Sequence, residues 1–243
     1  MSDRIDRVRS FFAEPEQYLR VRGDFNIRIR AEVVQGLVGP EPVDTILDIG
    51  CGNGAISLPL LRGRTRLTLL DISRNMLDLA SARIPADARD RVTLVNDDFM
   101  AADLPTRSFD LILCLGVLAH VDSPTAVIER MANVLRPGGR VIVQNNDARH
   151  PLGYLLSAYS SLSRKLLPEP YVLNRIRSDA VIKDFGRHGL RLVGGYRYAM
   201  PLPGMTRLFS GDQLYRAIRT VHGTEADNQR AWLGSECIFE FRR

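Results

Sequence analysis

The fold of this chain is decided by residues 45–54, which read Thr45-Ile46-Leu47-Asp48-Ile49-Gly50-Cys51-Gly52-Asn53-Gly54. The stretch is a short apolar run that ends in an acid and three glycines at alternate positions. Such a run is typical of a strand buried on both faces of a parallel sheet. The glycines allow a tight turn and the close approach of a ligand to the backbone, and a helix is expected to begin directly after them. The stretch therefore predicts a nucleotide-type cofactor loop at the carboxyl end of the first strand.

The spacing of the glycines and the position of the acid indicate which cofactor this loop binds. The dinucleotide fingerprint G-x-G-x-x-G cradles a pyrophosphate, whereas here the third glycine comes one residue early and Asp48 precedes the first. A carboxylate at this place suits a cationic amine better than a pyrophosphate. The loop resembles that of the class I S-adenosylmethionine-dependent methyltransferases, whose cofactor carries no phosphate. The resemblance implies that the cofactor contacts Asp48, Gly50, Cys51, Gly52, Asn53 and Gly54.

A second buried strand is predicted at residues 67–70, and it ends in Asp71. An acid about 20 residues after the loop can accept hydrogen bonds from both ribose hydroxyls, in dinucleotide-binding proteins as well. The next residues, 72–77, resemble the methyltransferase pattern acid-x-Ser-x-x-Met-Leu. This resemblance implies that Ile72 and Met76 pack against the adenine. The alternative for Met76 is a core residue at helical spacing.

Two further segments resemble the same family. After a predicted strand at residues 92–95, the family places an acid that accepts from the adenine amino group; strand register favours Asp98, followed by Phe99, over Asp97. The apolar run at residues 109–114 resembles the fourth strand, whose terminal carbonyl, at Leu115, would accept from the methionine amine. A Pro-Gly-Gly turn at residues 137–139 then begins a fifth strand. The matching segments follow in order over residues 43–146.

The pattern predicts one domain over residues 1–243. Alternating strands and helices predict an α/β fold, a doubly wound and mostly parallel Rossmann-like sheet. Two final strands bring the predicted sheet to seven strands, and the resemblance implies that the last strand runs antiparallel to the others. Long connections rich in apolar and aromatic residues are expected to form substrate lids. The predicted parts are a helical N-terminal cap at 1–40, a cofactor-binding core at 41–146, lids at 147–190 and 199–234, and final strands at 191–198 and 235–243.

The composition argues against a nucleic-acid enzyme, a membrane-spanning protein and a metalloprotein. The net charge of +5 comes from dispersed arginines, whereas a nucleic-acid enzyme more often shows a dense basic stripe. Neither a leader's apolar segment nor an apolar run of about 18 residues is apparent, so no membrane span is expected. The three cysteines show no metal-binding spacing, which fits a cytoplasmic protein. Residues 145–147 offer too few hard oxygens for Mg²⁺, and no metal is predicted.

Methyl transfer requires an aligned acceptor and, for an oxygen nucleophile, a group that removes its proton. His150, after the fifth strand, and His120, after the fourth, are the candidate bases; a structural hydrogen bond near the cofactor is the alternative for His120. Tyr18 in the cap would reach the methionine end of the cofactor or the substrate, with core packing as the alternative. His188 and His222 are expected at the surface.

The predicted function is S-adenosylmethionine-dependent methylation of a small molecule, foremost O-methylation of a metabolite or natural-product intermediate. Transfer to nitrogen or carbon is the alternative within the class. Residues 115–118 read Leu-Gly-Val-Leu where amino methyltransferases of DNA and protein place Asn/Asp-Pro-Pro-Tyr, which argues against those substrates. The alternatives from other classes are an NAD-dependent oxidoreductase and a non-catalytic binding module. A monomer or homodimer is expected, with no nucleic-acid partner.

Overall fold

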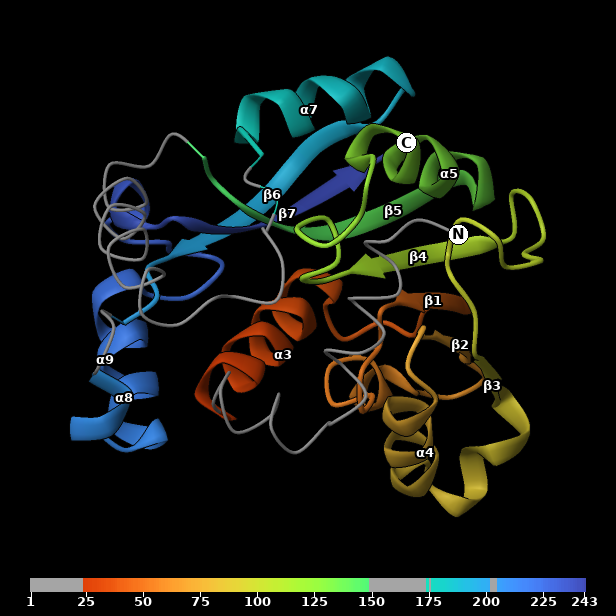
Figure 1. The fold of residues 1–243 in the computed structure, drawn as a ribbon, viewed down its shortest axis with the longest axis horizontal. Helices are drawn as coiled ribbons and strands as arrows, with labels where there is room; N and C mark the ends of the chain where they lie inside the picture. The colour runs from red at the N-terminus through yellow and green to blue at the C-terminus, as the bar shows by residue number, and fades with distance from the viewer. Residues whose placement is uncertain (1–23, 149–173, 175, 202–204) are drawn as a thin grey trace.

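The computed structural model describes residues 24–148, 174, 176–201 and 205–243, and within these ranges the chain forms a seven-stranded sheet (Figure 1). The strand order is β3-β2-β1-β4-β5-β7-β6. The first five strands are parallel, and β7 runs antiparallel to both of its neighbours. The predicted fold class is therefore confirmed. The strands are β1 Thr45–Ile49, β2 Arg66–Leu70, β3 Val92–Val95, β4 Phe109–Cys114, β5 Leu135–Asn146, β6 Arg191–Tyr198 and β7 Glu236–Arg242.

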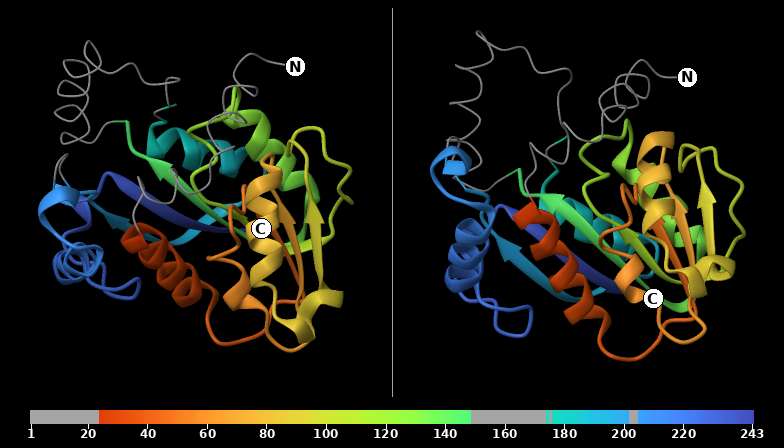
Figure 2. Two further views of the ribbon diagram at one scale, coloured as in Figure 1. Left: turned by 60° about the horizontal axis from the view of Figure 1, so that its bottom comes forward. Right: turned by 90° about the horizontal axis from the view of Figure 1, so that it is seen from below.

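Helices cover both faces of the sheet, which explains why the central strands are apolar on both sides. Ile46 of β1 packs in a core shared with α3, α4 and α9, while its neighbour Leu47 packs in a second core shared with α5 and α7. Figures 1 and 2 show these layers, with α9 alongside α3. The α-helices are α3 Asp24–Val38, α4 Arg74–Arg83, α5 Pro124–Val134, α7 Ser178–Arg187, α8 Met205–Leu208 and α9 Gly211–His222. The 3₁₀ helices are η1 Leu58–Leu60, η2 Ala86–Arg91 and η3 Ala231–Leu233.

The expectation of a helix directly after the glycine loop is wrong. Residues 52–57 form turns, and only the short η1 follows them. Pro59 has no N–H to donate and restricts the residue before it, so a regular α-helix is disfavoured here. The loop is held instead by backbone bonds, because the N–H groups of Gly50 and Cys51 both donate to Leu70 O, at 2.8 and 3.1 Å.

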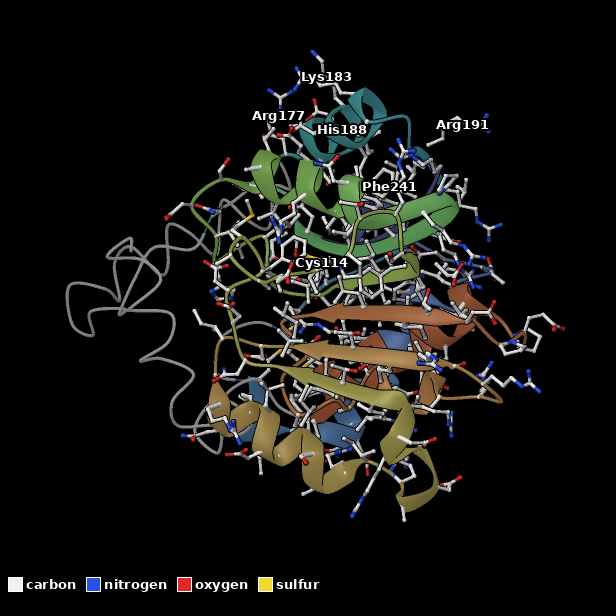
Figure 3. All side chains as sticks on the ribbon, turned by 90° about the vertical axis from the view of Figure 1, so that its right-hand side faces the viewer. Cys114, Arg177, Lys183, His188, Arg191 and Phe241 are labelled. Atoms are coloured by element: carbon white, nitrogen blue, oxygen red, sulfur yellow. The ribbon has the colours of Figure 1, made fainter. Side chains whose placement is uncertain are left out.

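The two long connections predicted to form lids contain helices that pack against the rest of the fold. Helix α7 lies within the predicted lid at 147–190, yet Phe185 stacks on Phe241 of β7 with ring centroids 4.1 Å apart. In Figure 3, Lys183 extends outward from α7, whereas Phe241 lies on its sheet side. Helix α9, within 199–234, packs on α3, where Arg28 stands 3.8 Å above the Tyr215 ring. The substrate-lid role of these two stretches stays a prediction.

His222, at the end of α9, is buried, so the expectation that it lies at the surface is wrong. Its side chain is only 2% exposed, and its Nε2 accepts a hydrogen bond from the Ala199 N–H at 3.2 Å. Burial lowers the pKa of His222, because a charged imidazolium loses its hydration there. His188, at the end of α7, is partly exposed. Within the described ranges, no helix has both the length and the apolar composition needed to span a membrane.

Candidate functional site

A cavity of about 330 Å³ opens at the carboxyl ends of β1, β2 and β4. This is the crevice where the strand order reverses between β1 and β4, the usual ligand position in an open α/β sheet. Its apolar lining side chains are Ile49, Leu70, Ile72, Met76, Phe99, Met100, Leu115, Val117, Val121, Ala126 and Val127. Its polar lining side chains are Asp71, Asp97, Asp98, His120, Asp122 and Ser123. The cavity thus collects residues from each of the segments that follow β1 to β4.

The glycine loop forms one wall of this cavity, and its glycines differ in what they face. Gly50, Gly52 and Gly54 all have positive φ, at 66°, 54° and 71°. A Cβ at Gly50 would lie 2.5 Å from Val117 Cγ2, and one at Gly54 would lie 2.8 Å from Leu58 Cδ1. A Cβ at Gly52 would meet no atom within 4 Å. Gly52 therefore presents open backbone to the cavity, whereas the other two glycines are required by protein packing.

The remaining predicted loop residues lie behind this wall. Cys51, Asn53 and Gly54 are not among the cavity-lining residues. The Cys51 side chain is buried in the core beside α3, and Asn53 Oδ1 accepts from the Ala55 N–H at 3.2 Å. These contacts close the loop on itself. A direct role of these three residues in cofactor binding stays a prediction.

Asp71 is held rigidly at the edge of the cavity. Its Oδ2 accepts from the Gly52 N–H and its Oδ1 accepts from the Ser73 N–H, both at 2.8 Å. The residue is 7% exposed; burial raises the pKa of Asp71, and these backbone hydrogen bonds oppose the rise. Each carboxylate oxygen keeps further acceptor capacity beyond its backbone donor. The side chain can therefore accept from a diol placed in the cavity.

Asp48 lies beneath the loop rather than in the cavity wall. It is 4% exposed and is not a cavity-lining residue. Burial raises the pKa of Asp48 to about 7; Ser57 opposes the rise and the charge of Asp71 adds to it. The predicted contact of Asp48 with a cationic amine stays a prediction, since this buried carboxyl group is not part of the cavity lining.

The raised pKa of Asp48 predicts a pH-dependent stability. Because the pKa is about 7 in the folded chain and about 4 in the unfolded one, the folded state retains a proton that the unfolded state loses. This stabilisation is complete below about pH 4 and is lost as the pH rises through 7. Asp48→Asn removes the titration, so its stability relative to wild type is expected to rise by about 2–3 kcal/mol from pH 5 to pH 8. Urea unfolding at both pH values measures this; a constant difference would contradict it.

The ends of β2 and β3 form the opposite wall. Helix α4 begins after Ser73, whose side chain accepts from the Met76 N–H, and this places Met76, 1% exposed, against the cavity. Phe99 also lines it and is 5% exposed. Asp98 Oδ1 accepts from the Met100 N–H at 3.0 Å. Both Asp98 and Asp97 line the cavity, so the choice between the two acids stays open.

Asn96 also supports the site, although the sequence motifs did not point to it. Its Nδ2 donates to Asp71 O at 3.0 Å and to Ile72 O at 3.2 Å. This fastens the end of β3 to the end of β2 and so supports Asp71 from behind. The sequence held one signal for this role: Asn96 is an amide directly after a short predicted strand, and such side chains commonly bind nearby backbone groups.

The fourth strand brings Leu115 and His120 to the cavity. His120 lies in a turn, in which its backbone N–H donates to Val117 O at 2.8 Å. The other predicted residues, His150 and Tyr18, lie outside the described residues. Among the residues that the structure describes, no group of three or more His, Cys, Asp or Glu side chains could hold a metal ion.

Arg30 is a second residue missed from sequence. Its side chain comes from α3, is 4% exposed, and places Nη1 3.6 Å from the position that a Cβ would take at the cavity-lining Gly116. Arginine is rarely buried unless it is paired or functional. The signal available in the sequence was a charged residue between Ile29 and Val33, inside the apolar stripe of the helix.

Residues 46–139 match the protein family described as "Methyltransferase domain". Over this stretch the chain is similar to that family. The chain is also similar to the "Ubiquinone biosynthesis O-methyltransferase" of Xanthomonas euvesicatoria pv. vesicatoria (strain 85-10), which is 32% identical over 128 residues. That similarity covers 51% of this chain and 52% of the relative. The chain thus spans about half the length of the curated relatives it matches.

Some solved structures share the fold of this chain over almost its whole length. A magnesium protoporphyrin IX methyltransferase from Synechocystis PCC 6803, with bound SAH, has a TM-score of 0.69 at 18% identity and covers 99% of this chain and 100% of its own. A possible histamine N-methyltransferase from Thermotoga maritima has a TM-score of 0.68 at 18% identity and covers 98% and 99%. At this identity the likeness shows the fold alone, and function must be argued from the site.

Proposed function

We propose that this chain transfers a methyl group from S-adenosylmethionine to a small-molecule acceptor, with an acceptor oxygen on a metabolite or natural-product intermediate as the foremost target. The observation that carries the proposal is Asp71, fixed by two backbone donors at the edge of a mostly apolar cavity. A carboxylate so placed suits a ribose diol, and the apolar wall suits an adenine.

The site residues suggest how the cofactor would lie. Its ribose would meet Asp71, and its adenine would pack between the Met76 and Phe99 side chains with Asp98 accepting from the amino group. The methionine amine would approach the carbonyl of Leu115. The carboxylate of the cofactor's methionine part would then lie near Arg30, because the Arg30 guanidinium borders Gly116, the residue after Leu115. A carboxylate and a guanidinium form strong charge-assisted hydrogen bonds.

The loop geometry disfavours a nicotinamide dinucleotide. Its pyrophosphate needs free backbone N–H groups and a helix N-terminus, whereas the Gly52 N–H already donates to Asp71 and only η1 follows the loop. The Asp71 carboxylate at the edge of the cavity would also repel the phosphates. These observations support S-adenosylmethionine over the oxidoreductase alternative.

The chemistry asked of the protein is modest. The acceptor attacks the methyl carbon in line, the carbon–sulfur bond breaks, and the sulfonium leaves as a neutral thioether, so alignment and exclusion of water supply most of the catalysis. An oxygen acceptor must also lose its proton, and His120 at the cavity is the described candidate for this base. The name of the curated relative, an O-methyltransferase, favours oxygen over nitrogen or carbon.

Isothermal calorimetry with three ligands tests the proposal. S-adenosylhomocysteine is expected to bind in the micromolar range, about −8 kcal/mol, and NADH is expected not to bind. 5′-Methylthioadenosine, which lacks the amino acid, is expected to bind more weakly. Arg30→Met should reduce the affinity difference between the first and third ligands, because the carboxylate loses its partner while the amine keeps the Leu115 carbonyl; this comparison is made within one variant. Binding of NADH, or of none of the three ligands, would sink the proposed function.

A further inference from the structure

One asparagine holds the turn that carries His120. The backbone N–H of Asn174 donates to Ala119 O at 2.8 Å. Its Nδ2 donates to Val121 O at 2.5 Å and reaches Leu118 O at 3.4 Å. Carbonyls on both sides of His120 are therefore bound by a single residue that lies more than fifty positions further along the chain.

The residues next to Asn174 are fastened to the end of β5. Asn145, only 3% exposed, donates through Nδ2 to Ile176 O at 2.9 Å and to Ser178 Oγ at 3.3 Å. The Ala148 N–H also donates to Ile176 O, at 3.3 Å. Asn174 thus contacts the loop that follows β4, while Ile176 and Ser178, the first residue of α7, contact the strand end of β5.

We infer that Asn174 is a positioning residue for the reaction proposed above: through the carbonyls of Leu118, Ala119 and Val121 it sets where His120 stands against the cofactor cavity. The inference rests on that proposed function. The turn needs such support because it follows Gly116, whose φ is 79°, and because its residues Val117, His120 and Val121 line the cavity. A displaced turn would move the cavity wall and the candidate base together.

Asn174→Asp is the sharpest substitution, because it keeps the shape and replaces the NH₂ donor with an oxygen that repels the Leu118 and Val121 carbonyls. A matched control exists in Asn228, whose Nδ2 donates to Arg197 O at 3.0 Å and to His222 O at 2.8 Å. This asparagine clamps β6 to the end of α9 in the same manner, with neither element lining the cavity. Asn174→Ser, which retains the backbone bond to Ala119, serves as a milder second variant.

Two readouts separate positioning from a general loss of stability. In ¹H–¹⁵N spectra of the histidine rings, assigned through His120→Gln, the His120 signal is expected to shift in Asn174→Asp and Asn174→Ser and to stay in place in Asn228→Asp. Calorimetry is expected to show S-adenosylhomocysteine affinity about tenfold lower in Asn174→Asp than in Asn228→Asp. An unmoved His120 signal, or equal affinities in the two variants, overturns the inference. If wild type fails to bind this ligand, the proposed function fails, and the His120 signal still decides the positioning.

Discussion

Replacing Asp71 by asparagine is expected to weaken the binding of S-adenosylhomocysteine by about 30-fold or more, which corresponds to about 2 kcal/mol. The carboxylate now accepts from the N–H groups of Gly52 and Ser73. An amide has only one accepting oxygen, so its NH₂ must face one of these donors. The variant thus loses a charge-assisted bond to the ribose and also loosens the glycine loop. Isothermal calorimetry on both proteins measures the change.

Asp78→Asn is the matched control for this substitution. Asp78 lies on α4 and does not line the cavity, and its exposed side chain pairs with Arg74 at 2.9 Å. Surface pairs of this kind contribute about 0–1 kcal/mol, and ligand affinity is expected to be unchanged in the control. Equal affinities in wild type and Asp71→Asn would remove Asp71 from the binding site and leave the proposed cofactor without its ribose contact.

Gly52→Ala is expected to reduce the affinity for the same ligand by about 100-fold or more. The added Cβ meets no protein atom within 4 Å, so it projects into space that the ligand must occupy. A methyl group in a closely packed contact forces either displacement or strain, and each 1.4 kcal/mol lost lowers affinity tenfold. Calorimetry with S-adenosylhomocysteine measures the effect.

The chain offers a close control for the backbone strain in this variant. Gly39 has φ of 79°, and a Cβ added there would also meet no atom within 4 Å, yet this glycine follows α3 and does not line the cavity. An alanine at either position costs about 1–2 kcal/mol of stability from the left-handed backbone. Gly39→Ala should therefore lose a similar amount of stability and keep full affinity. A Gly52→Ala protein that binds as tightly as Gly39→Ala would show that the ligand lies elsewhere.

Features that depend on neighbours in the chain were predictable from sequence. The apolar run of β1, the alternate glycines and the acid at the end of β2 are local patterns, because strand burial and positive φ are imposed residue by residue. The start of α4 after Ser73 follows from the same local chemistry. Two sequence-based expectations were wrong because other contacts outweigh the local signal: Pro59 disfavours the expected helix, and the packing of α9 buries His222.

The sequence by itself thus determined the parallel sheet, the glycine loop and the position of Asp71 at a strand end. Tertiary structure alone decided which distant side chains support that site. Arg30 reaches Gly116 only because α3 crosses the sheet, and Asn174 reaches the His120 turn only because the chain returns there before α7. Such contacts join residues far apart in sequence, and they are set by how helices pack on a sheet, which no short pattern of residues encodes.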